Sequence, residues 1–200
     1  MGRKAIRRER KALSPKAISW LRELIPLMEG KDLDKLTLDE LAALLGKSKS
    51  TLYTYFSTKE EIFAAAVQLV LTDLAFVASP EALATEDMEA ALRELLRSLS
   101  KGLDGVPISF LQQLKLHYPQ IWLSIEQFTT AVLANFECIY RLGMERGDFK
   151  GYNLALLCAL DQYFVLSIMP NAEIFKDEGL SLEALVKEYL DLRMAALRVD

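Results

Sequence analysis

Apolar residues recur throughout this 200-residue chain at spacings of three and four, and a strict alternation of apolar and polar residues never persists. Spacings of three and four place side chains on one face of an α-helix, whereas alternation is typical of a β-strand. The apolar stretches are separated by helix-capping residues, glycine or proline. The pattern therefore predicts an all-α protein with about nine helices.

The capping residues divide the chain into these predicted helices. Pro26 lies inside the first of them and should kink or shorten it, because proline lacks the amide hydrogen that a helix interior requires. Asp161 and Gln162 interrupt the apolar surface of the eighth helix, so burying either one requires hydrogen-bond partners. We expect helices over 14–29, 37–45, 48–56, 57–78 and 85–102, a sixth that begins near 107, and helices over 119–147, 152–169 and from 181 onward.

The charge of the chain changes sign near residue 60. Residues 1–60 contain 13 Lys and Arg against 8 Asp and Glu, whereas the remaining residues contain 11 against 20. A basic head on an acidic body is typical of a chain in which only the head meets a polyanion. A solvated, disordered tail has the same composition, so that alternative stays open. The basic residues of the first sixteen positions are Arg3, Lys4, Arg7, Arg8, Arg10, Lys11 and Lys16.

The residue types exclude several functional classes. Cys138 and Cys158 are too few for a disulfide framework and lack metal-ligand spacing. With His117 as the single histidine, and with neither a nucleophile elbow nor a phosphate-binding loop, we expect no enzyme, no metal and no cofactor. No stretch approaches the roughly 18 apolar residues of a membrane helix, and no apolar segment follows the basic N-terminus. We therefore expect a cytoplasmic protein without membrane contact.

The segment 37–63 has the pattern of a helix-turn-helix: a helix, a turn containing Gly46, a second helix and a capped third helix. In such a motif the second helix lies in the major groove of DNA, and its N-terminal residues face the base edges. Those residues here are Ser48, Lys49, Ser50 and Thr51, although Ser and Thr at helix starts are also ordinary caps. Phosphate contacts are expected from phenol hydroxyls and helix N-termini, which are supplied by Tyr53, Tyr55, Thr37 and Lys59.

The segment from Leu36 to Phe63 resembles the helix-turn-helix of the TetR family of bacterial transcriptional regulators. The resemblance is carried by SKSTLYTYF at 48–56 and by STKEE at 57–61, and GMERGDF at 143–149 resembles a turn between bundle helices of that family. It implies a three-helix DNA-binding domain over 1–60, joined through a long fourth helix to a helical ligand-binding and dimerisation bundle over 61–200. By position it implies DNA contacts from Thr37, Lys49, Ser50, Thr51, Tyr53, Tyr55 and Lys59. Lys47 departs from the family, which usually has an apolar residue there.

The same resemblance implies a cavity for a small effector in the body, and a homodimer that pairs the last two helices of each copy. The aromatic and polar residues of the middle helices either line that cavity or form a plain core, and the apolar stripes of the last two helices either pair with a second copy or pack within a monomer. The candidate ligand-binding residues are Phe76, Phe110, Gln113, His117, Trp122, Phe128 and Tyr163; the candidate dimerisation residues are Leu154, Leu157, Cys158, Val165, Leu182, Leu185, Val186 and Tyr189. We expect the two cysteines to be inert core thiols.

These features predict a transcriptional regulator, in the first place a repressor, that binds a palindromic operator in double-stranded DNA as a homodimer. A small, largely hydrophobic effector would release it by changing the separation of the two DNA-binding heads through the fourth helix. The alternative is a nucleoid or cell-division adaptor on the same scaffold, which binds DNA and a protein partner rather than a metabolite.

Overall fold

The structure is a computed structural model that describes residues 12–168, 170, 171, 179 and 181–199. Most of the predicted basic arm, from Arg3 to Lys11, lies outside the described residues. Lys16, its last member, is exposed.

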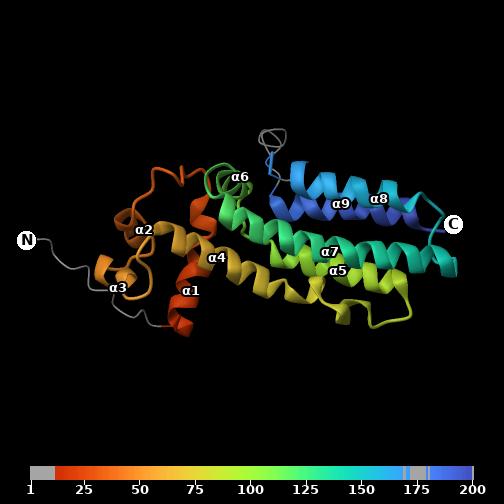
Figure 1. Ribbon diagram of the computed structural model, residues 1–200, viewed down its shortest axis with the longest axis horizontal. Helices are drawn as coiled ribbons and strands as arrows, with labels where there is room; N and C mark the ends of the chain where they lie inside the picture. The colour runs from red at the N-terminus through yellow and green to blue at the C-terminus, as the bar shows by residue number, and fades with distance from the viewer. Residues whose placement is uncertain (1–11, 169, 172–178, 180, 200) are drawn as a thin grey trace, which may run out of the picture.

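The described residues form nine α-helices and no β-strand, so the predicted all-α fold is confirmed. Figure 1 shows an elongated molecule with α1 to α3 at one end, a bundle of α5 and α7 to α9 at the other, and α4 and α6 between them. Short turns of other helix types, η1 to η4, interrupt the order. The elements are α1 (Pro15–Leu24), η1 (Pro26–Met28), α2 (Leu38–Leu44), α3 (Lys49–Tyr53), α4 (Lys59–Asp73), η2 (Ala75–Ala78), η3 (Pro80–Leu83), α5 (Met88–Gly102), α6 (Ile108–His117), α7 (Pro119–Arg146), α8 (Leu154–Tyr163), η4 (Phe164–Ile168) and α9 (Leu182–Leu197).

Most of the α-helices begin at a side chain that caps their free backbone N–H groups, whereas α6 and α7 have no such cap. The hydroxyl of Ser14 accepts a hydrogen bond from the N–H of Ala17, and the other predicted hydroxyl caps do the same three residues on. At Thr37 the capping box is complete, because the Glu40 carboxylate also accepts from the Thr37 N–H at 2.8 Å. Such caps typically stabilise a helix by about 1 kcal/mol each.

Four predicted helices end several residues earlier than expected. The third was expected to reach residue 56 but ends at Tyr53. The first stops at Leu24, and the chain continues as η1 from Pro26, which confirms the predicted effect of that proline. The fourth was expected to reach residue 78 but ends at Asp73 and continues as η2. The side-chain amide of Asn135 donates to the carbonyls of Val77 and Ser79 there, both at 2.9 Å.

The eighth predicted helix, expected over 152–169, is α-helical only to Tyr163 and then widens into the π-helical turn η4. Two contacts accompany this change. The ring of Phe164 stacks on Tyr189 with centroids 3.7 Å apart, and the amine of Lys115 donates to the carbonyl of Leu166 at 2.7 Å. Both partners come from other helices, so the local sequence does not reveal them.

Buried apolar side chains form one cluster that extends from α1 through the middle helices to α9. The helix α4 contributes Ile62 and Phe63 near its start and Val67 farther along. The division that we propose between residues 60 and 61 therefore falls within α4, which packs against both ends of the molecule.

Candidate DNA-binding surface and buried cavity

The turn between α2 and α3 fixes the direction of α3. Gly46 has a left-handed backbone (φ 61°), and its N–H and that of Lys47 bond to the carbonyls of Ala43 and Ala42 at 3.0 and 2.8 Å. This arrangement closes the end of α2 and favours glycine, which has no Cβ to oppose a positive φ. Leu52, 2% exposed, anchors α3 on the core side, so the start of α3 points outward.

Most of the predicted DNA-contact residues are at the surface. Ser48 is exposed, and its hydroxyl caps α3 while lying 2.9 Å from that of Ser50 and 2.7 Å from that of Thr51. The Lys49 amine forms an ion pair with Asp39 at 2.7 Å, and this hydrogen bond raises the pKa of Lys49, which keeps it cationic. Tyr53 is exposed, with the Lys49 amine 5.8 Å from its ring centroid.

Three other predicted contacts have polar atoms that are bonded within the protein. The hydroxyl of Thr37 accepts from the N–H of Glu40 and donates to its carboxylate, although the residue is exposed. The hydroxyls of Tyr55 and Ser14 are 3.2 Å apart, and the Lys59 amine donates to the carbonyl of Leu33 at 3.0 Å. Lys59 also donates to the carbonyl of Asp34. Tyr55 and Lys59 are half-buried, so both hold α1 and the loop before α2 in place.

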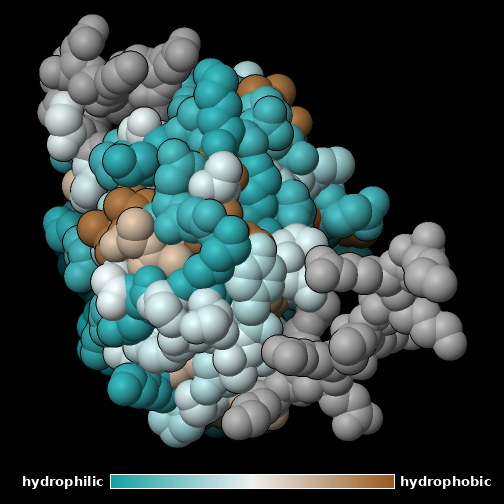
Figure 2. Space-filling view, turned by 90° about the vertical axis from the view of Figure 1, so that its left-hand side faces the viewer, coloured by the Kyte–Doolittle hydropathy of each residue, from teal (hydrophilic) through white to brown (hydrophobic). Residues whose placement is uncertain are grey.

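Lys47, which departs from the family pattern, is half-buried, with its amine 5.3 Å from the ring centroid of Trp20. Figure 2 views the end of the molecule that carries α2 and α3, and its surface is mainly hydrophilic, with brown apolar areas at the left and the upper right of the view. A polar surface around an exposed α3 suits contact with phosphates and base edges.

A cavity of about 120 Å³ lies in the body, bounded by α4, α5, α6, α7, α9 and the region of α8 and η4. Of the predicted ligand-binding residues, Phe110, Trp122 and Phe128 line it. The structure places the other four away from its wall, which corrects our assignment. Phe76 and Tyr163 are 44% and 62% exposed, His117 is exposed at the end of α6, and Gln113 accepts a hydrogen bond from the Leu33 N–H at 3.3 Å.

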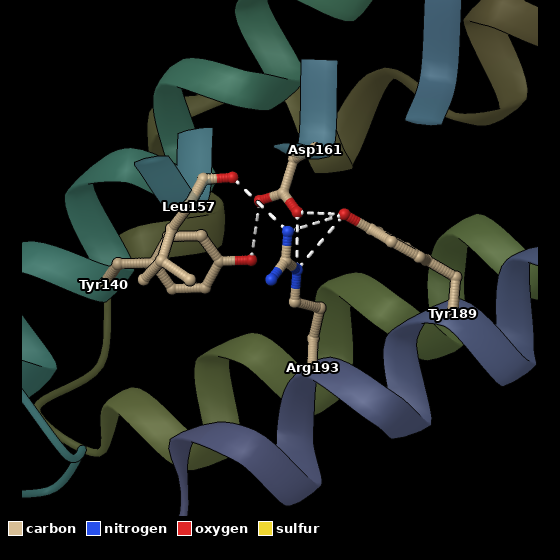
Figure 3. A network of polar contacts seen from close by, with 5 residues as sticks. All are labelled: Tyr140, Leu157, Asp161, Tyr189 and Arg193. Carbon is tan, nitrogen blue, oxygen red and sulfur yellow. Dashed lines mark hydrogen bonds and ion pairs between the residues drawn. The ribbon is translucent and has the colours of Figure 1, made fainter. Parts of the chain in front are cut away.

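One wall of the cavity includes the buried carboxylate of Asp161, which has the hydrogen-bond partners that its burial requires. The Tyr140 and Tyr189 hydroxyls donate to it at 2.9 and 2.5 Å, and the Arg193 guanidinium donates at 2.8 Å (Figure 3). Burial and the neighbouring carboxylate raise the pKa of both tyrosines, so they remain protonated donors. The network joins α7, α8 and α9. Gln162 is exposed instead.

Four of the eight predicted dimerisation residues are buried within the protein itself. Leu157, Leu182, Leu185 and Val186 belong to its own core, so these four have no surface to offer to a second copy. Leu154, Cys158, Val165 and Tyr189 are half-buried, as is Cys138, so neither cysteine is a core thiol. The exposed apolar residues of these helices are others, namely Leu156, Leu160 and Tyr163 on α8 and Leu192 on α9.

Two structural features are absent from the described residues, a membrane-spanning helix and a metal-binding cluster. Among them no helix combines the length and the apolar character that crossing a membrane requires. Within the same residues, no three His, Cys, Asp or Glu side chains lie together as a metal site would need.

The exposed α3, its anchored turn and the all-α body define a helix-turn-helix DNA-binding protein. The sequence model of the family described as "Bacterial regulatory proteins, tetR family" matches residues 25–66, which include α2, α3 and the start of α4. The resemblance is therefore confirmed: residues 25–66 have the helix-turn-helix of TetR-family transcriptional regulators.

Known proteins agree with this assignment. The chain is 29% identical over 94 residues to the uncharacterized HTH-type transcriptional regulator YvaF of Bacillus subtilis (strain 168), a match that spans 46% of this chain and about half (49%) of that relative. The structure of the TetR-family regulator PfmR from Thermus thermophilus has a TM-score of 0.66 at 25% identity, covering 94% of this chain and 100% of PfmR. FadR from Bacillus subtilis, solved in complex with stearoyl-CoA, shares the fold with a TM-score of 0.61 at 16% identity, covering 90% of this chain and 98% of FadR.

Proposed function

We propose that the protein is a repressor that binds a palindromic operator as a homodimer and leaves it when a small, largely hydrophobic effector enters the cavity. The observation that carries this proposal is the position of α4. Val67, Val70 and Leu71 of α4 line the cavity, while the same helix begins six residues after Tyr53, the last residue of α3. A ligand that displaces α4 therefore acts on the DNA-binding head.

A second connection runs through α6. Phe110 and Leu111 of α6 line the cavity. On the other side of α6, Ser109 accepts from the Gly30 N–H at 3.1 Å, and at its end Tyr118 donates to the Leu33 carbonyl at 2.9 Å. The loop that contains Gly30 and Leu33 leads into α2. An effector that prefers one arrangement of α4 and α6 shifts the population of head positions.

The homodimer would form through the exposed apolar face of α8 and α9, which we define by Leu156, Leu160, Tyr163 and Leu192. Figure 1 shows these two helices along one edge of the bundle, remote from α3. A two-fold axis through this face would place one head on each side and allow two half-sites to be read. An adaptor that binds only a protein partner would not need the cavity, so the cavity favours the regulator.

The DNA contacts that we propose are the exposed Thr37, Ser48, Lys49, Ser50 and Tyr53, together with the half-buried Thr51. Tyr55 and Lys59 would reach phosphate only by giving up the partners described above. FadR shows that this fold can hold an acyl-CoA, which supports an effector with a hydrocarbon part.

Selection of bound sequences from random duplex DNA tests the proposal, followed by titration of the selected duplex with wild type and two variants. Lys49→Met should weaken binding to all duplexes, because one phosphate contact is lost. For the same reason the negative slope of log affinity against log salt should become shallower by about one. Lys187→Met is the matched control, since both lysines are exposed and each is paired with an aspartate, at 2.7 and 2.9 Å. Failure to enrich a palindrome, or equal behaviour of the two variants, contradicts the proposed function.

A further inference from the structure

The wall of the cavity is almost entirely apolar. Val67, Phe110, Trp122 and Phe136 are typical of its residues, which come from widely separated parts of the chain. Four lining side chains carry polar atoms, namely Trp122, Thr129, Asp161 and Tyr189, and the lining residues in the described part of the chain include no Lys, Arg or His. The Trp122 N–H already donates to Glu126 at 2.8 Å and the Tyr189 hydroxyl to Asp161 at 2.5 Å, so Thr129 and the carboxylate network of Asp161 decide what the cavity accepts.

Thr129 lies in the middle of α7 and is 6% exposed. Within the part of the chain that the structure describes, no hydrogen-bond partner is found for the Thr129 hydroxyl, and no side-chain oxygen or nitrogen is both fully buried and without a partner. The Thr129 oxygen therefore adjoins open space, which the cavity that this residue lines provides. Its neighbour Thr130 differs, because it is exposed and donates to the carbonyl of Glu126 at 2.9 Å. The Thr129 hydroxyl is thus a donor and acceptor left available to a bound molecule.

Asp161 has the opposite character. Its carboxylate is 4% exposed and accepts from Tyr140, Tyr189 and Arg193, while the same guanidinium also bonds to the Tyr189 hydroxyl at 2.8 Å and to the Leu157 carbonyl at 3.5 Å. An anion in the cavity would be buried near a carboxylate whose cationic partner is already engaged. Desolvating a charge without a partner is strongly unfavourable.

A lysine near the cavity is also engaged. The Lys115 amine lies 5.4 Å from the ring centroid of Trp122 and donates to the Leu166 carbonyl at 2.7 Å. Lys115 is exposed and does not line the cavity. It therefore does not supply a buried counter-charge for an acidic ligand.

We propose that the cavity selects uncharged molecules with a hydrocarbon skeleton and one hydrogen-bonding oxygen, which meets the Thr129 hydroxyl, and that it discriminates against carboxylates of the same skeleton. This inference rests on the proposed function, because it names the chemical class of the effector for the same cavity.

The test measures the binding of three small probes to the full-length protein by isothermal titration calorimetry at pH 7. The probes are 1-hexanol, hexanoate and benzene, since apolar cavities of about 150 Å³ bind benzene and this one is 120 Å³. On the wild type, 1-hexanol should bind at least about tenfold more tightly than hexanoate, because the carboxylate must lose its hydration without gaining a cation. Benzene should bind but should not depend on Thr129.

The variant Thr129→Val keeps the shape of the side chain and removes its hydroxyl. It should weaken 1-hexanol about tenfold, the usual effect of leaving one buried polar group unpaired, and should leave benzene unchanged. Thr130→Val is the matched control and should change neither probe. The wild-type comparison of 1-hexanol with hexanoate needs no variant, so it decides the charge selectivity even if Thr129→Val is poorly folded.

The outcomes separate this inference from the proposed function. Hexanoate binding as tightly as 1-hexanol, or equal effects of the two valine variants, overturns the inference while the cavity still binds ligands. If none of the three probes binds, both the inferred selectivity and the proposed effector-binding function are overturned. Binding of 1-hexanol that leaves the affinity for the selected operator unchanged contradicts effector control and leaves the selectivity of the cavity supported.

Discussion

Gly143 lies near the end of α7, where the chain turns back and the ring of Phe149 covers it. The turn is closed by Gly147 in a left-handed conformation (φ 83°) and by a hydrogen bond from the Asp148 N–H to the Gly143 carbonyl at 2.9 Å. A Cβ atom added at Gly143 would lie 2.2 Å from the Phe149 ring, which is far inside van der Waals contact. The close approach of ring and backbone therefore requires glycine here.

Replacing Gly143 by alanine should destabilise the protein by about 1–3 kcal/mol, because the Phe149 ring must move out of its packed position. Gly151→Ala is the matched control, since no atom lies within 4 Å of the Cβ that it would add and its φ is not positive. Urea unfolding, monitored by circular dichroism, measures the stability of both variants. An unchanged midpoint for Gly143→Ala, or an equal loss in the control, would contradict this account.

At the residue scale, the sequence predicted what depends on near neighbours. The caps at Ser14, Thr37 and Ser48 follow from a hydroxyl three residues before an amide, and the structure confirms them. The partners of Tyr55 and Gln113 are 41 and 80 residues away along the chain, so no local pattern could show that these side chains hold the fold together.

At the scale of the element, α6 connects the cavity to the loop before α2. The Tyr118 hydroxyl at its C-terminal end is buried against the Leu33 carbonyl. Burial raises the pKa of Tyr118 to about 12, so the group is a neutral donor at all physiological pH values. Because Leu33 is 0% exposed and precedes α2, this bond ties the position of α6 to the head.

Tyr118→Phe should therefore reduce the change in operator affinity that an effector produces while leaving effector affinity nearly unchanged. Loss of one hydrogen bond should cost about 1 kcal/mol of stability. Tyr152→Phe is the matched control, because its hydroxyl also donates to a backbone carbonyl, that of Ala196 at 3.1 Å, but joins the start of α8 to α9. Operator titrations with and without 1-hexanol measure the coupling. Equal coupling in wild type and Tyr118→Phe would show that α6 does not transmit the signal.

Element boundaries were less predictable than element types. Capping residues marked most helix starts, whereas the segments that follow α4 and α8 accept hydrogen bonds from Asn135 and Lys115, which lie on other helices. The cavity was harder still. Three of the predicted ligand-binding residues line the cavity, but its wall is assembled from helices that are distant in the sequence. Thr129 also carries no local sequence signal that distinguishes it from Thr130.

At the scale of the whole molecule, the sequence indicated apolar stripes on α8 and α9 but not whether they pack inward or against a second copy. The α9 residues Leu182, Leu185 and Val186 pack inward, next to α5. Leu192, on the same helix, is 71% exposed. The spacing of apolar residues does not distinguish a face that packs against the rest of the chain from a face that stays exposed. Only the packing of the neighbouring helices determines which face is buried.

Leu160, 46% exposed on α8, lies on the face where we expect the second copy, so Leu160→Lys should convert the dimer to a monomer. A lysine there would have to lose its hydration at an apolar interface without a partner, which is costly, whereas in the monomer it remains in water. Sedimentation equilibrium should show half the mass with unchanged helix content, and the operator affinity should fall at least about tenfold because the two heads bind independently.

Leu116→Lys supplies the control for this change, because Leu116 is 71% exposed on α6 and is not one of the four residues that define the proposed dimer face. It should leave both mass and operator affinity as in the wild type. A palindrome with both half-sites intact should distinguish the two variants, whereas a duplex with a single half-site should bind wild type and Leu160→Lys with similar affinity. Retention of the dimer in Leu160→Lys, or its loss in Leu116→Lys, would place the second copy on another face of the molecule.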